Sequence, residues 1–207
     1  MYTHTDYLPW TTGMVYTMRK YSSSGEPITG PEVNTKDLTI EFSIPVVASS
    51  SSHESELQAV DSDGNKQFFR KLTDPQTACE GVALERLVGS LYDVKLVPPI
   101  FVLQDPVQPN QSWGPYKVDA VSNWTRFSVE YSGKIEGPFE VDAHARKFTL
   151  TYRVTISYVV RLFGVHFLTG REFFWLAPGV GIVQQSFERG PYNIDPWRVL
   201  VAAHDKP

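Results

Sequence analysis

Few side chains in this sequence are spaced so that they could do chemistry together. Asp142 and His144 are two residues apart, so on a β-strand they would share one face, where a carboxylate can orient an imidazole as a general base. No third partner stands nearby, and Arg146 and Lys147 follow directly, so we interpret the pair as solvated side chains. An enzyme that uses Asp142 and His144 is the minor alternative.

Two further candidates have simpler interpretations. Cys79 is the single cysteine and could act as a nucleophile, but a lone cysteine is more often a packing residue, and it cannot form an internal disulfide. Residues 61–65 resemble the start of a calcium loop, in which glycine is sixth and glutamate twelfth, whereas here glycine is fourth and Leu72 is twelfth. Asp63 and Gly64 instead predict a hairpin turn.

Other chemical motifs are missing from the sequence. It contains no serine-hydrolase elbow, phosphate loop or dinucleotide-binding string, and its five histidines do not have the spacing of metal ligands. We therefore predict a non-enzymatic protein with no cofactor and no metal site.

Composition restricts the class of protein further. The 207 residues carry a net charge of −4, and 20% of them are charged, which disfavours a nucleic-acid partner. This length suits one β-rich domain over residues 1–207. Residues 1–10 lack the basic start and apolar run of a signal peptide, so we expect none within this sequence. Arg153 and Arg161 argue against a membrane-spanning helix in the apolar stretch 148–167.

The clearest structural signal is a long alternation in residues 148–160. Its apolar side is made by every second residue, namely Phe148, Leu150, Tyr152, Val154, Ile156, Tyr158 and Val160. A period of two predicts a strand with one buried face. Shorter alternations and many turn residues elsewhere predict an antiparallel meander of about eight to ten strands.

We therefore expect a mostly β fold, a strongly curved antiparallel sheet or half-barrel with one or two short helices. The helices are expected within residues 82–92 and 195–203. Ser49 to Ser52 cannot pack and are expected at a mobile loop tip. Pro178 and Gly179 predict a turn between strands at residues 171–177 and 180–187.

After Val160 the alternation fails, and apolar side chains occur on both faces of the chain. A buried central strand would explain this pattern, and so would a lipid, a protein partner or a membrane surface that covers one face. The residues of this candidate interface are Val159, Leu162, Phe163, Val165 and Phe167.

Three segments carry a resemblance to a known family. Residues 175–183 (WLAPGVGIV), the opening Tyr7-Leu8-Pro9 with Gly13 and Tyr16, and residues 98–103 followed by Ser112-Trp113 resemble bacterial envelope lipoproteins described as TapB-like and loosely related to LolA-like half-barrels. The resemblance implies a curved sheet around an apolar interior, a place on the periplasmic side of the bacterial cell envelope, and no catalytic residues.

The sequence thus predicts a cell-envelope binding or accessory protein whose apolar concave face holds a lipid or another apolar small molecule. The residues expected to line that face are Phe148, Tyr152, Ile156, Tyr158 and Trp175. The alternative is a structural subunit of a larger membrane-associated complex, with the candidate interface in contact with a protein partner or a membrane surface.

Overall fold

The computed structural model describes residues 3–8, 13–21, 38–43, 56–122, 125–143, 146–189 and 193–205. Within these residues one short helix and twelve strands follow one another along the chain. They are α1 (His4–Tyr7), β1 (Met14–Tyr21), β2 (Leu38–Ser43), β3 (Glu56–Asp61), β4 (Lys66–Thr73), β5 (Glu80–Val88), β6 (Asp93–Gln104), β7 (Ser112–Ser122), β8 (Thr125–Ala143), β9 (Arg146–Leu162), β10 (Val165–Ala177), β11 (Gly181–Arg189) and β12 (Asn193–Asp205).

The strands form one antiparallel sheet that curves into a closed barrel. Each strand pairs with the next along the chain, and β1 pairs with both β2 and β12, so hydrogen bonding continues around the ring. The prediction of a mostly β, strongly curved antiparallel sheet is confirmed. The described residues hold more strands than the eight to ten expected.

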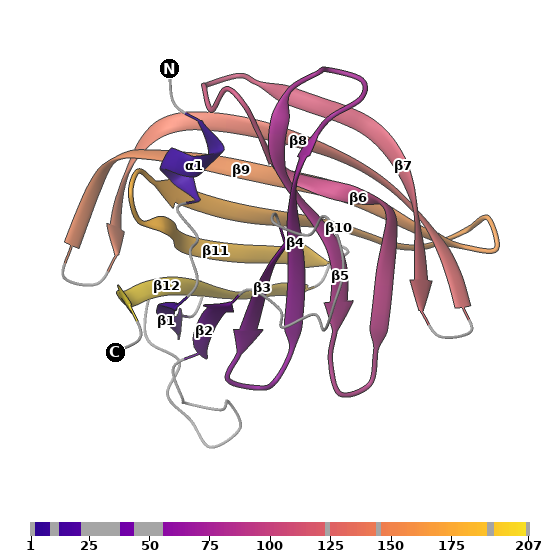
Figure 1. Ribbon diagram of the computed structural model, residues 1–207, viewed down its shortest axis with the longest axis horizontal. Helices are drawn as coiled ribbons and strands as arrows, with labels where there is room; N and C mark the ends of the chain where they lie inside the picture. The colour runs from indigo at the N-terminus through magenta and orange to yellow at the C-terminus, as the bar shows by residue number, and fades with distance from the viewer. Residues whose placement is uncertain are drawn as a thin grey trace.

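The barrel has two ends with different coverings (Figure 1). At the helix end, α1 lies beside the connections from β6 to β7 and from β10 to β11. At the hairpin end lie the turns that join β3 to β4, β5 to β6 and β9 to β10. Because consecutive strands run in opposite directions, these turns all fall on the side away from α1.

The long alternation is strand β9, as predicted. Tyr152, Val154 and Ile156 are buried on the inner face, at 8%, 0% and 4% exposure. Tyrosine, valine and isoleucine suit a β-strand because aromatic and β-branched side chains pack well on a pleated surface. Towards the helix end, bulges interrupt the pairing of β9 with β8, and Leu150 is exposed there.

Both predicted turns are confirmed. Gly64 has a φ of +83°, and its amide donates a hydrogen bond to the carbonyl of Asp61 between β3 and β4. Gly179 has a φ of +70° in the turn after Pro178, and Ala177 pairs with Gly181 across that hairpin. Glycine adopts such positive φ values without the steric cost that a side chain brings.

Neither of the two predicted helices forms at its expected position. Residues 82–88 belong to β5 and residues 195–203 belong to β12. In both segments the pairing with neighbouring strands outweighs the local propensity, which is a weak determinant of structure. The helix that forms is the single turn α1, whose start is capped by Thr3 and Asp6.

The ladder between β6 and β7 is incomplete. Pairing runs from Val94 to Val97 and then stops at Pro98 and Pro99, which have no backbone N–H to donate. Side chains of β7 and β8 bond to the backbone of β6 beyond this point. The Trp113 indole N–H of β7 donates to the Phe101 carbonyl at 3.2 Å, and the Phe101 N–H donates to the Tyr131 hydroxyl of β8 at 3.1 Å.

Candidate functional site

The barrel encloses a cavity of about 590 Å³. Strands from every part of the ring contribute to its wall, and most of the contributing side chains are apolar. Its volume lies within the range of roughly 300 to 1,000 Å³ that is usual for small-molecule sites. The cavity is therefore the candidate functional site of this protein.

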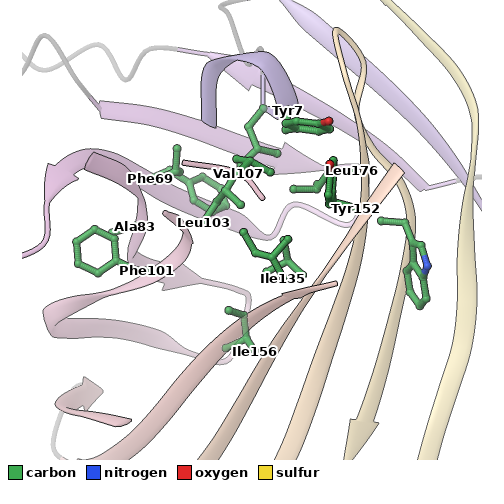
Figure 2. Packing of buried hydrophobic residues seen from close by; sticks show 14 of the residues in the cluster. Tyr7, Phe69, Ala83, Phe101, Leu103, Val107, Ile135, Tyr152, Ile156 and Leu176 are labelled. Carbon is green, nitrogen blue, oxygen red and sulfur yellow. The ribbon is translucent and has the colours of Figure 1, made fainter. Parts of the chain in front are cut away.

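The floor of the cavity lies at the helix end. Leu8 and Leu176 line it there, and they are 6% and 2% exposed. Figure 2 shows Tyr7 of α1 next to Tyr152 and Leu176. The Tyr7 and Tyr152 rings meet edge to face with centroids 5.3 Å apart, a favourable arrangement for aromatic pairs.

Hydrogen bonds fix α1 over this floor. The backbone N–H of His4 donates to the Asp105 carboxylate, and His4 Nδ1 lies 2.7 Å from Asp105 Oδ2. The Gly179 N–H donates to the Asp6 carbonyl at 2.7 Å. Helix α1 is thus joined to the β6–β7 and β10–β11 connections and closes this end of the cavity.

The cavity opens at the hairpin end. Tyr92 and Phe167 line it there, and they are 42% and 63% exposed. Beside them in the same two hairpins, Leu91 is 93% exposed and Phe163 is 88% exposed. Both hairpins at the entrance therefore carry exposed apolar side chains. Exposed apolar surface of this kind is uncommon on monomeric proteins and often marks a contact site.

Two of the five predicted ligand-binding residues line the cavity, namely Ile156 and Tyr158. Phe148, Tyr152 and Trp175 are not among its lining residues. Phe148 lies near the start of β9, next to a shift in the β8–β9 register, and Tyr152 packs against Tyr7 instead. The alternation in the sequence suggested that the open interior continues along the whole of β9. At the helix end, however, α1 occupies the space next to Tyr152, and bulges change the pairing of β8 with β9.

Trp175 lies on the outer face of β10. Its neighbours Phe174 and Leu176 line the cavity, and the pleat sends alternate side chains to opposite faces. The Arg153 guanidinium is 5.9 Å from the Trp175 ring and donates to Glu136 at 2.7 Å. Hydrogen bonds from Lys134 and Arg153 hold the pKa of Glu136 below its usual value.

The predicted interface divides into two parts. Val159 and Leu162 are half-buried in β9. Phe163, Val165 and Phe167 are exposed at 88%, 70% and 63% around the β9–β10 turn. These three side chains form an exposed apolar tip on the border of the cavity entrance.

Sequence reasoning missed a polar cluster on the cavity wall. Glu172, Gln185 and Arg198 come from the adjacent strands β10, β11 and β12, and all three line the cavity. Gln185 Nε2 donates to Glu172 Oε1 at 3.1 Å, and Gln185 is paired in register with Arg198. The available signal was Glu172 itself, which is two and four residues before the inward-facing Phe174 and Leu176.

A second polar cluster is structural. The buried carboxylate of Asp74 accepts hydrogen bonds from the Tyr116 hydroxyl, Gln104 Nε2 and the Gln76 backbone N–H. Burial raises its pKa, but these hydrogen bonds together outweigh burial and leave the pKa below its ordinary value. The cluster joins the β4–β5 connection to β6 and β7, next to the incomplete ladder.

The structure describes two of the three chemical candidates, Asp142 and Cys79. Asp142 is exposed at the end of β8, while His144 and Ser49 to Ser52 lie outside the described residues. Cys79 is half-buried between β4 and β5, and its Sγ donates to the Thr77 carbonyl at 3.7 Å.

Among the residues that the structure describes, no group of three or more His, Cys, Asp or Glu could hold a metal ion. No helix in the described ranges is long and apolar enough to cross a membrane.

Comparison with known proteins gives two similar crystal structures. A "putative lipoprotein" from Parabacteroides distasonis is similar with a TM-score of 0.47 and 12% identity, over 99% of this chain and 100% of that chain. A "putative exported protein with YmcC-like fold" from Bacteroides fragilis is similar with a TM-score of 0.44 and 12% identity, over 96% of this chain and 99% of that chain. No family model and no curated protein sequence matches the chain.

Proposed function

We propose that this protein is a non-enzymatic binding protein of the bacterial cell envelope that holds a lipid-like ligand inside its barrel. The observation that carries the proposal is the apolar cavity of about 590 Å³, with a buried floor and an entrance at the hairpin end. The envelope location rests on the resemblance of three sequence segments to TapB-like lipoproteins.

The energetics of the cavity support an apolar ligand. Tyr158 and Val160 of β9 line the cavity at successive inward positions, and both are only half-buried. Covering an apolar side chain of this size contributes about 1.5 to 3 kcal/mol relative to leaving it in water. A chain-like apolar molecule that contacts several of these positions at once gains this stabilisation repeatedly.

A matched pair of variants tests ligand binding. Val160 lines the cavity, whereas its neighbour Val159 points to the opposite face of β9. Saturable fluorescence enhancement of N-phenyl-1-naphthylamine is expected with the delipidated wild-type protein. Val160→Trp fills the cavity and is expected to weaken probe binding at least tenfold, while Val159→Trp leaves it within twofold. Absence of saturable binding, or equal effects of the two variants, would refute the proposal.

A second candidate function is supported by the exposed apolar tip. Phe163, Val165 and Phe167 lie at the β9–β10 turn with more than half of each side chain exposed. This arrangement fits a structural subunit of a larger membrane-associated complex, in which a partner covers the tip.

Size measurement of the purified chain tests this second function. A subunit that lacks its partner is expected to self-associate as concentration rises, and Phe163→Ser with Val165→Ser is expected to restore the monomer. Leu150→Ser is the control, because Leu150 is 45% exposed on β9 near the helix end. A wild-type protein that stays monomeric throughout the concentration range contradicts the subunit function.

A further inference from the structure

The wall of the cavity carries charged side chains among mostly apolar ones. Glu172 and Arg198 both line the cavity, with Gln185 between their strands. Gln185 is 7% exposed and donates to Glu172 at 3.1 Å. The Arg198 guanidinium lies 5.3 Å from the centre of the Phe187 ring, which also lines the cavity.

Two other polar groups that line the cavity, Asp61 and Tyr131, have structural roles. The Asp61 carboxylate accepts hydrogen bonds from the backbone N–H groups of Asp63 and Asn65 and from the Asn65 side chain, and so holds the β3–β4 turn. At the seam, the Tyr131 hydroxyl accepts the Phe101 N–H. The cluster of Glu172, Gln185 and Arg198 lies instead across the paired strands β10, β11 and β12, beside the register shift between Gln185 and Phe187.

The surroundings of this polar cluster are apolar on both sides along the barrel axis. Towards the floor, Leu176 and Ile182 follow on the same two strands, and towards the entrance Leu168 and Phe167 precede Glu172. A ligand that matches this wall has a polar group that forms hydrogen bonds at mid-wall and an apolar part that covers the surface beyond it.

The charges of the cluster restrict the ligand's headgroup. One carboxylate, one guanidinium and one amide offer both donors and acceptors with no net charge. A hydroxyl group can donate to Glu172 and accept from Gln185 or Arg198. A carboxylate headgroup would meet Arg198 but would be repelled by Glu172.

We infer that the cavity binds a single-chain amphiphile with an uncharged, hydroxylated headgroup, of the monoacylglycerol type, whose headgroup is held by Glu172, Gln185 and Arg198. This inference rests on the proposed function and adds the class of ligand to it. The acyl chain of the ligand then contacts the apolar wall, and the polar cluster selects between headgroups.

Displacement of bound N-phenyl-1-naphthylamine tests the inference with three ligands of equal chain length. On the wild-type protein, 1-monolauroylglycerol is expected to displace the probe at least tenfold more tightly than methyl laurate or laurate, since hydrogen bonds to charged groups give differences of this size. Glu172→Gln removes the negative charge and is expected to raise laurate affinity about tenfold while monolauroylglycerol affinity falls.

Glu188→Gln is the matched control. Glu188 lies on β11 and pairs with Arg171 at 2.8 Å outside the cavity lining, so this variant is expected to keep the wild-type order of ligands. If Glu172→Gln does not fold by circular dichroism, Gln185→Glu replaces it and is expected to lower laurate affinity.

The outcomes separate the two proposals. If the probe itself fails to bind the wild-type protein, the proposed function fails and the ligand class fails with it. If the probe binds but the three ligands displace it equally, or laurate is preferred, or laurate affinity does not change in the expected direction in the cluster variant that folds, the headgroup inference alone is overturned.

Discussion

The indole of Trp113 lies directly over the backbone of Gly133, its register partner in the neighbouring strand β8. A methyl group at Gly133 would overlap the Trp113 ring. Trp113 is 3% exposed and also donates its indole N–H to Phe101 across the seam between β6 and β7. The missing side chain at Gly133 therefore makes room for the ring that joins β6 to β7 where the ladder stops.

This contact predicts that Gly133→Ala destabilises the barrel. Overpacking of this kind commonly costs about 1 to 3 kcal/mol. The free energy of unfolding, measured by urea denaturation, is expected to fall by that amount.

A double-mutant cycle identifies the cause of the loss. In a Trp113→Ala background the added methyl meets no ring, so Gly133→Ala is expected to cost little further free energy. Equal costs in both backgrounds would mean that the backbone of β8, and not the indole, resists the substitution.

Asp74 gives the protein a specific sensitivity to acid. Its folded-state pKa is below the unfolded value of about 3.9, so the unfolded state binds more protons in this range. The stabilisation is present above about pH 4 and is lost as the pH falls through the lower, folded-state pKa. The free energy of unfolding is therefore expected to fall on acidification from pH 5 to pH 3.

Comparison with Asp74→Asn isolates this contribution. The variant is expected to be less stable at pH 7 and to show a shallower dependence on pH below 4. Asp142→Asn, at an exposed carboxylate of β8, is the control and should keep the wild-type slope. An unchanged slope in Asp74→Asn would show that other carboxylates account for the acid sensitivity.

Asp105 is expected to control how firmly α1 closes the cavity floor. Asp105→Ala removes the acceptor of the His4 N–H and the partner of the His4 ring, both at a part-buried site. Losing such partners costs about 1 to 3 kcal/mol, so α1 should open about tenfold or more often.

Hydrogen exchange at the Gly179 amide measures this opening, because that amide donates to the Asp6 carbonyl of α1. Its exchange rate is expected to rise about tenfold or more in Asp105→Ala. Asp63→Ala, at the hairpin end, should leave it unchanged. Slow exchange at Gly179 in both variants would mean that Tyr7 and Leu8 alone hold α1 in place.

The strands were predictable where a local pattern and the global fold agree. The alternation around Tyr152 and Ile156 has a strict period of two. The two predicted turns contain Gly64 and Gly179, and glycine is the residue that most easily adopts the positive φ that such turns need. The helix expected at residues 195–203 failed because an aspartate followed by proline also occurs within a paired strand, and only the pairing with β1 and β11 decides between the two.

The sequence predicted an apolar interior, but it did not predict how far the open cavity extends along β9. Alternation shows that Ile156 and Tyr158 face inward, but it cannot show that α1 fills the space next to Tyr152 or that bulges alter the pairing near Phe148. The cluster of Glu172, Gln185 and Arg198 depends on the register of three strands, which one sequence does not specify.

Phe163 occupies a backbone conformation that does not suit its side chain. It has a φ of +50°, and Gly164, the other residue of this two-residue turn, has a φ of +81°. Turns with two positive φ values favour asparagine and glycine, and the left-handed region costs most other residues about 1 to 2 kcal/mol. Phe163 is also 88% exposed, so little burial offsets this cost.

Phe163→Asn is therefore expected to raise the free energy of unfolding by about 1 kcal/mol, measured by urea denaturation, because asparagine tolerates this conformation. Phe163→Val is the opposite control and should lower it, since a β-branched residue tolerates positive φ poorly. If the exposed tip is also a docking surface, Phe163→Asn should be more stable but lose self-association in the size measurement. A Phe163→Asn protein less stable than wild type would show instead that the phenyl ring makes a stabilising contact at the tip.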